Sequence, residues 1–337
     1  MYKLIKNMSI CGVCLLPLST IAESNTVYGD FRFSFNSIDN GTTSTISGNN
    51  NATRLGMKGD IGKKEGITAF YHLQYGANVD AAGGSAFSQR FFFAGIKGGF
   101  GKLVYGRTST PYKMAGLKLD PFYDTSAGSG LGGSNYGLSP TTNGWSDNTI
   151  AYSTPKLGAF SLNASTYLDD TDANEHDINL GVKYAQNSFT GGIQYMSAGD
   201  TGIVAKSIAD STSIRVHATY KMAAWNITAS VETIDTNATD SHQYAYLSAT
   251  LQASDDMKWA ASYGSVSEVS AEADGTGITF GGFYKLLDKT TVYALYSSKS
   301  SDDYSVPAYN ANSSKQLGLF DRDVFSIGVS HKFSLTL

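Results

Sequence analysis

The 337-residue sequence predicts an all-β fold, a sixteen-stranded antiparallel transmembrane β-barrel with a long third loop folded into its lumen. Three observations support this prediction. Short segments alternate apolar and polar residues with a period of two, as strands between lipid and water do. The connections between these segments are alternately short and long, which is typical of a barrel with turns at one membrane face and loops at the other. Beyond the first 22 residues, no run reaches the roughly 18 apolar residues of a membrane-spanning helix.

The first 22 residues are expected to be a signal peptide that is removed, leaving residues 23–337 as one barrel domain. Lys3 and Lys6 precede the apolar stretch Ile10–Leu18, and a small-residue cleavage signature ends at Ala22. The apolar stretch is too short to span a bilayer. Both cysteines lie in this segment, so the mature chain is expected to have no thiol chemistry.

Composition excludes one class of partner and fits a barrel. The formal net charge is −4, and removal of the two N-terminal lysines makes the mature chain more acidic. This balance argues against nucleic acid as a partner and favours a mild preference for cations in any channel. The mean hydropathy of −0.18 suits a barrel, because only alternate residues face lipid.

The strands are read from the alternation, which is clearest at the two ends of the mature chain. In Val27–Phe35 the three phenylalanines share one face with Val27, and in the last strand apolar residues keep one parity to Leu337, interrupted by His331. The sixteen predicted strands begin near Val27, Arg54, Ile67, Gln89, Leu103, Thr149, Phe160, Ile178, Phe189, Ile214, Trp225, Gln243, Lys258, Ile278, Thr291 and Val324. An even number of strands places both termini on one side of the membrane.

The connection Ser109–Asn148 is far longer than the short turns and has no sustained periodicity. Long connections without secondary structure of their own are usually functional or disordered. A barrel of about sixteen strands encloses an aqueous channel that is too wide to filter solutes by itself. We therefore expect this connection to narrow the channel.

Charged residues indicate where the channel is narrow. Arg32, Arg54 and Arg90 lie on the polar faces of their strands, with Arg90 expected on the face opposite Phe91 and Phe93. The barrel interior is where strand arginines stay hydrated, so the three are expected to form a basic wall. Asp120 and Asp124 of the long connection are expected to oppose this wall.

Several sequence runs resemble the Gram-negative general porins, and one of them resembles their neisserial-type branch. They are Val27-Tyr28-Gly29, Arg54-Leu55-Gly56-Met57-Lys58-Gly59, Ala94-Gly95-Ile96-Lys97-Gly98-Gly99-Phe100-Gly101, Tyr105-Gly106-Arg107 and, for the neisserial-type branch, Asp147-Asn148-Thr149-Ile150-Ala151-Tyr152-Ser153-Thr154-Pro155. The resemblance implies an outer-membrane homotrimer that contacts lipid and lipopolysaccharide and passes small hydrophilic solutes and ions.

The resemblance also assigns residues. The wall arginines of the family fall on Arg54 and Arg90, the acids of its third loop on Asp120 and Asp124, and an arginine near its subunit contact on Arg107. The Pro-Glu-Phe-Gly motif of the family loop is replaced by Asp120-Pro121-Phe122-Tyr123-Asp124.

Other functions remain open on the sequence. A sugar-specific channel would use a row of aromatic residues, for which the candidates are Tyr112, Phe122, Tyr123, Tyr136 and Trp145. An adhesin or receptor would use the long loops. An outer-membrane enzyme would need a catalytic group that no local motif indicates. The interpretation adopted is a channel with no enzymatic activity, no cofactor and no metal.

Overall fold

The computed structural model describes residues 25–79, 85–128, 137–139, 144–168, 177–199, 210–236, 241–268, 273–301 and 321–337. Its elements are β1 (Thr26–Asp39), β2 (Ser44–Asn50), β3 (Arg54–Lys64), β4 (Ile67–Ala77), β5 (Phe87–Gly98), β6 (Gly101–Ser109), α1 (Pro111–Gly116), β7 (Trp145–Ser153), β8 (Phe160–Tyr167), β9 (Asp177–Gln186), β10 (Phe189–Ala198), β11 (Ser211–Met222), β12 (Trp225–Thr236), β13 (Ser241–Gln252), β14 (Met257–Glu268), β15 (Ala273–Leu287), β16 (Thr290–Ser301) and β17 (Arg322–Thr336). Within these ranges no helix is long and apolar enough to cross a membrane.

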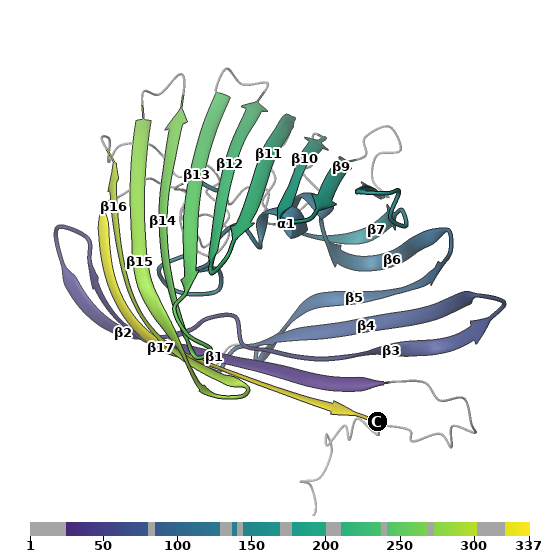
Figure 1. Ribbon diagram of the computed structural model, residues 1–337, viewed down its shortest axis with the longest axis horizontal. Helices are drawn as coiled ribbons and strands as arrows, with labels where there is room; N and C mark the ends of the chain where they lie inside the picture. The colour runs from purple at the N-terminus through teal and green to yellow at the C-terminus, as the bar shows by residue number, and fades with distance from the viewer. Residues whose placement is uncertain are drawn as a thin grey trace, which may run out of the picture.

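The strands form one closed antiparallel barrel (Figure 1). β1 pairs with β17 from Thr26↔Thr336 to Asp39↔Asp323, which joins the first strand to the last. On its other side β1 pairs first with β3 and then with β2, so β2 and β3 together form one barrel strand, interrupted between Asn50 and Arg54. The barrel therefore has sixteen strands, and the predicted fold class is confirmed.

The alternation of short and long connections makes 36–53, between the first two predicted strands, a long loop, and this prediction is wrong because β2 lies within it. The hairpin of β1 and β2 extends beyond the barrel (Figure 1), and Ile46 in it is 87% exposed. Ile46 is the only large apolar residue of Ser44–Asn50, so this stretch has no apolar period by which to recognise a strand.

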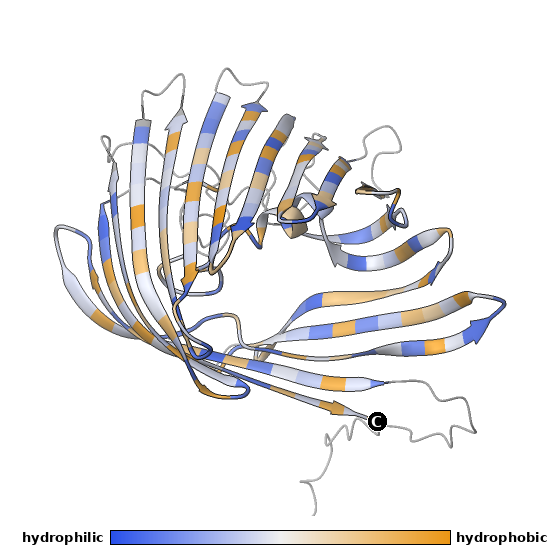
Figure 2. Ribbon diagram, in the orientation of Figure 1, coloured by the Kyte–Doolittle hydropathy of each residue, from blue (hydrophilic) through white to orange (hydrophobic). Residues whose placement is uncertain are grey.

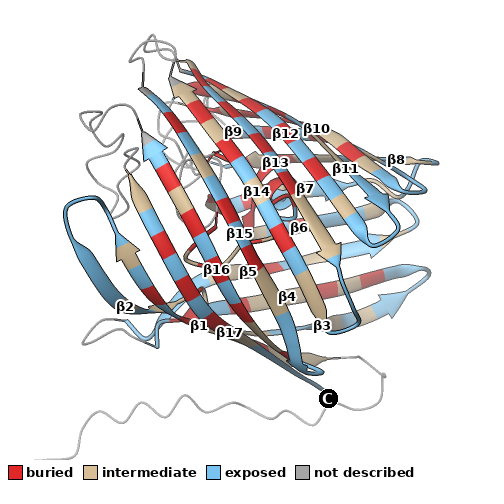
Figure 3. Cartoon of the chain, turned by 60° about the vertical axis from the view of Figure 1, so that its left-hand side comes forward, coloured by how far each residue is buried: buried red, intermediate tan, exposed pale blue. Residues whose placement is uncertain are grey.

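Hydrophobic and hydrophilic residues alternate along the strands (Figure 2), and the large apolar residues are the exposed ones. In β13, Leu247 is 51% exposed, whereas the neighbouring Tyr246 and Ser248 are 3% and 4% exposed. Figure 3 shows the same alternation as stripes of buried and exposed residues across the sheet. A row of outward leucine, isoleucine and aromatic residues is stable in contact with lipid, and the inner face is suited to water.

The short connections lie at one end of the barrel, which we call the short-turn side, and β1 begins and β17 ends at this side (Figure 1). Several of these turns hold two residues between paired strands. Glu65, Asn187 and Ala223 in them have φ values of 49°, 52° and 51°. A positive φ gives a hairpin turn the twist of its flanking strands, which keeps these connections tight.

The described part of the long connection lies against the inner faces of β11–β16. Thr110 caps α1 by accepting a 2.9 Å hydrogen bond from the Lys113 amide, and Pro111 occupies the first turn, where its missing N–H costs nothing. Farther along, the Ser248 hydroxyl donates to the Leu119 carbonyl at 2.9 Å and the Thr279 hydroxyl to the Ala127 carbonyl at 3.1 Å.

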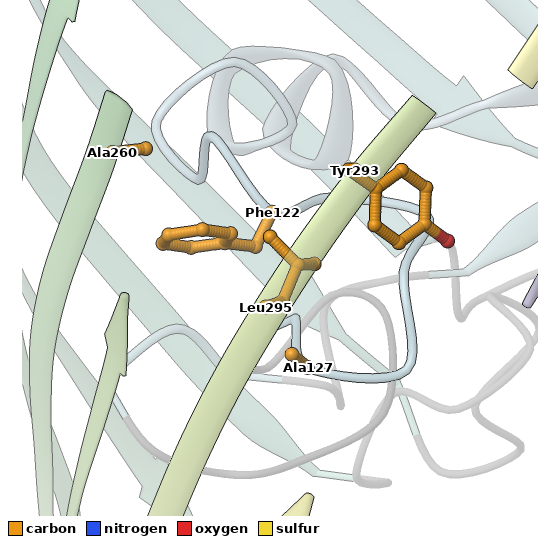
Figure 4. Packing of buried hydrophobic residues seen from close by; sticks show 5 residues of the cluster. All are labelled: Phe122, Ala127, Ala260, Tyr293 and Leu295. Atoms are coloured by element: carbon orange, nitrogen blue, oxygen red, sulfur yellow. The ribbon is translucent and has the colours of Figure 1, made fainter. Parts of the chain in front are cut away.

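Phe122 attaches the same segment to the wall through apolar contacts. It is fully buried in a cluster with Ala127, Ala260, Tyr293 and Leu295, which come from the segment, β14 and β16 (Figure 4). Phe283 of β15 packs on it with ring centroids 6.0 Å apart. Polar contacts and this cluster together fix the position of the segment in the lumen.

Candidate channel constriction

Three arginines lie on the inner faces of neighbouring strands, facing the segment 110–128. Arg32 is on β1, Arg54 on β3 and Arg90 on β5. Arg32 Nε donates to Asp30 Oδ2 at 2.8 Å, and Asp30 is paired in register with Arg54. Arg90 Nε donates to Gln74 Oε1 of the intervening strand β4 at 2.8 Å. The sequence prediction of a basic wall corresponds to this row.

Asp124 projects from the segment onto the wall. Its Oδ2 accepts a hydrogen bond from Arg54 Nη2 and lies 3.5 Å from Arg32 Nη1. The backbone of Asp124 has a φ of 59°, a left-handed conformation that aspartate and asparagine tolerate better than most residues. The turn thus directs this carboxylate toward two of the three guanidinium groups.

Tyr123 lies between Asp124 and the arginines, a role that the sequence analysis did not predict. Both Arg54 and Arg90 interact with its hydroxyl. Burial, and next the Asp124 carboxylate, raise the pKa of Tyr123 above its ordinary value. The phenol therefore stays neutral at physiological pH and adds no charge to the site.

The expected alternation in β5 is wrong at Arg90. The pairing of β4 and β5 shifts register between Leu73 and Tyr75. As a result Phe91 meets Trp145 edge to face with centroids 4.8 Å apart, and the Arg90 guanidinium also lies 4.8 Å from the Trp145 ring. The irregularity brings two consecutive residues, Arg90 and Phe91, to the inner face, whereas strict alternation would place them on opposite faces.

Asp120 does not reach the arginine wall. Its Oδ1 accepts hydrogen bonds from the Phe122 amide at 2.8 Å and from the Tyr246 hydroxyl at 2.9 Å, and the residue is 3% exposed. An aspartate that bonds the amide two residues on stabilises a turn. The structure therefore places Asp120 on the β13 side of the lumen and separates it from Asp124.

A buried ion pair holds α1, and the sequence analysis missed it. Arg215 of β11 and Glu232 of β12 are register partners, with Nη2 and Oε2 2.9 Å apart and both side chains fully buried. Glu232 Oε1 accepts from the Tyr112 hydroxyl at 2.9 Å, and Arg215 Nη1 donates to the Tyr112 carbonyl at 3.1 Å. The sequence does place these opposite charges on two adjacent predicted strands. The register of the two strands, which the sequence alone does not give, was needed to show that they pair.

The aromatic residues considered for a sugar path do not form a row. Tyr112 and Phe122 are completely buried, and Trp145 is covered by Arg90 and by Lys113, whose ammonium lies 4.3 Å from its ring. Tyr136 lies outside the described residues. The inner surface near the arginines is therefore mainly charged and polar.

The match to a family of known proteins is extensive. A family model described as Gram-negative porin matches residues 12–304. The chain belongs to the Gram-negative porin family. A comparison with curated protein sequences finds no match. The neisserial-type resemblance remains a prediction, because the family model does not specify a branch.

Solved porin structures share the fold at low sequence identity. An anion-selective porin from Comamonas acidovorans is similar at 17% identity, with a TM-score of 0.79 over 92% of this chain and 100% of that chain. OmpT of Vibrio cholerae is similar at 18% identity, with a TM-score of 0.70 over 94% and 99%. OmpF of Salmonella typhi in complex with daunomycin is similar at 17% identity, with a TM-score of 0.68 over 92% and 97%.

Membership of this family places the porin in the outer membrane of a Gram-negative cell, as a multi-pass barrel for passive diffusion of small hydrophilic solutes. Arg107, which the resemblance assigns to a position near the subunit contact, lies on the face of β6 opposite Val104 and Thr108, and its Nη1 donates to Asp147 at 2.6 Å. The channel-lining charges described above are thus distinct from this outer pair.

Proposed function

We propose that Arg32, Arg54 and Arg90, with Asp124 and Tyr123 opposite them, form the constriction at which this porin selects solutes by size and charge. The observation that carries the proposal is the contact of Asp124 with Arg54 and Arg32. It brings a loop carboxylate against the wall inside a barrel otherwise wide enough for free diffusion. Charges facing each other across a narrow aqueous gap set a transverse field that orients and sorts polar solutes. The function needs no catalytic step and no cofactor.

Asp120 is left out of this proposal as a facing charge. Its carboxylate is buried against Tyr246, so we propose that it shapes the turn that presents Asp124. Of the two acids predicted from the sequence, only Asp124 then contributes negative charge to the constriction.

We propose further that the constriction favours anions weakly, although the acidic overall charge suggested cations. Three guanidinium groups meet two carboxylates there, those of Asp30 and Asp124. Salt screens charges beyond about 8–10 Å, so distant acidic loops act less on a permeating ion than the groups at the narrowest point. The local excess of one positive charge therefore decides the preference.

Two single substitutions test this in opposite directions. Arg54→Gln removes the local excess, and Asp124→Asn increases it while keeping a residue that tolerates positive φ. One unit charge a few ångströms from an ion in water changes its energy by about 1 kcal/mol, so the anion-to-cation permeability ratio should change about twofold to fivefold. The measurement is the reversal potential of the purified porin in planar bilayers under a KCl gradient.

The matched control is Lys64→Gln, which removes one positive charge from an exposed short-turn position. It should leave the reversal potential unchanged. If Arg54→Gln and Asp124→Asn shift the reversal potential in the same direction, or no more than Lys64→Gln, the constriction lies elsewhere.

We propose that the porin acts as a homotrimer in contact with lipopolysaccharide, after cleavage of the chain following Ala22. In support, Arg107 and Asp147 form an ion pair on an otherwise apolar outer face, and OmpT of Vibrio cholerae has been solved in a trimer form. Closure of single insertions in three equal steps in planar bilayers is the expected result. Single-step closures would contradict the trimer and leave the constriction proposal intact.

A further inference from the structure

A second charged region lies in the lumen on the short-turn side of α1. A cavity of about 380 Å³, partly open to the lumen, lies between α1 and the inner faces of β6–β11. Its α1 side is apolar, formed by Met114, Ala115 and Leu119, and its strand side is mainly polar. None of the residues assigned to the constriction lines it, so it is a separate site.

Among the residues that the structure describes, the cavity is lined by basic groups and by no carboxylate. Lys102 of β6, Lys183 of β9 and Lys118 at the end of α1 line it, together with His217 of β11. In the part of the chain that the structure describes, none of these three lysines forms an ion pair, whereas Lys97 lies 2.7 Å from Asp60. Uncompensated ammonium groups in one concave region attract anions from solution.

Two amide groups in the same cavity have unused hydrogen-bonding capacity. Gln194 is 2% exposed, and its Oε1 and the Oδ1 of Asn163 have no hydrogen-bond partner among the described residues. A Cβ atom at Gly181 would lie 2.1 Å from Gln194 Oε1 and 2.5 Å from Asn163 Oδ1, so a glycine is required for these amides to come together. Buried polar atoms are almost always paired with protein or with water, so these two oxygens are acceptors for a water molecule or for a donor group of a bound solute.

We propose that this cavity binds small carboxylates that carry hydroxyl groups, such as sugar acids, before or after they pass the constriction. The lysines neutralise the carboxylate, the hydroxyl groups donate to the orphan amide oxygens, and the carbon chain lies on Met114 and Leu119. Weak binding beside the path raises the local concentration of such a solute without stopping its passage. The inference rests on the open channel and not on the charge preference of the constriction.

The test compares three six-carbon probes added on the short-turn side of the purified porin in planar bilayers. Gluconate has the charge and the hydroxyl groups, hexanoate has the charge alone, and sorbitol has the hydroxyl groups alone. Gluconate should produce concentration-dependent partial blocks of the KCl current, with weaker blocks by hexanoate and none by sorbitol. In Lys118→Gln/Lys183→Gln the half-blocking concentration of gluconate should rise about fivefold, as expected for two solvated ion pairs.

Lys221→Gln is the matched control, because Lys221 is on the same inner face of β11 as His217 but does not line the cavity. It should retain the wild-type block. Absence of gluconate block in the wild type would overturn the proposal. So would equal block by sorbitol, or a block that is unchanged in the double variant.

Discussion

Arg215→Ala is expected to release α1 from the barrel wall and to make the open-channel current noisy. The substitution removes the Arg215 guanidinium from the buried Glu232, and the Tyr112 hydroxyl and the Ser139 amide that donate to this carboxylate are neutral groups. Removing one member of a buried ion pair costs about 3–5 kcal/mol, because the remaining charge loses its compensation. The arginine also donates to the Tyr112 carbonyl in α1, so its loss weakens the attachment of the segment 110–128 to the barrel wall.

The measurement is open-channel current noise together with the melting temperature of the detergent-solubilised porin. Arg215→Met/Glu232→Leu is the matched comparison, because replacing a buried ion pair by apolar residues of similar size is often neutral. It should recover much of the melting temperature lost in Arg215→Ala. A quiet, fully stable Arg215→Ala porin would show that this pair does not hold the segment.

Phe122→Ala is expected to detach the other end of the segment and to change both conductance and selectivity. Phe122 is completely buried among Ala260, Tyr293 and Leu295, and truncating such a phenylalanine costs about 3–5 kcal/mol. Asp124 follows two residues later. Its displacement would leave three arginines opposed by Asp30 alone, so the conductance should rise and the anion preference should strengthen.

Single-channel conductance and reversal potential, measured on the same preparation, check this. Phe325→Ala makes the same truncation on the outer face, where Phe325 is 49% exposed, and should leave both quantities unchanged. An increase in conductance without a change in reversal potential would separate Asp124 from charge selection. No change in either would mean that Phe122 does not position the segment.

Most of the barrel could be predicted because each strand can be recognised from its own residues. Alternation of lipid-facing and water-facing residues identifies each transmembrane strand, and all sixteen predicted strand starts lie within a few residues of the observed ones. β2 was missed because Ser44–Asn50 contains a single large apolar residue, Ile46, and therefore no alternation. Alternation also failed at Arg90, because the irregularity beside Leu73 depends on the pairing of two strands.

The site could be predicted only in part. The strand arginines follow from parity, since Arg32 and Arg54 are on the polar faces of regular strands. In the segment, Asp120 and Asp124 have the same charge and are four residues apart, yet one binds Tyr246 and the other Arg54. That difference follows from the positive φ of Asp124 and from packing of the intervening Phe122, which a sequence without periodicity does not reveal.

The central claim is that Arg54 faces an aqueous passage and lies where that passage is narrow. The most direct test is chemical modification of Arg54→Cys by a water-soluble thiol reagent during single-channel recording. The expected chain without its leader has no other cysteine. The current should fall stepwise as each introduced thiol reacts, while Ile327→Cys, 52% exposed on the outer face, should leave it unchanged. A full current from a modified Arg54→Cys porin, or a thiol at this position that the reagent cannot reach, would contradict the account.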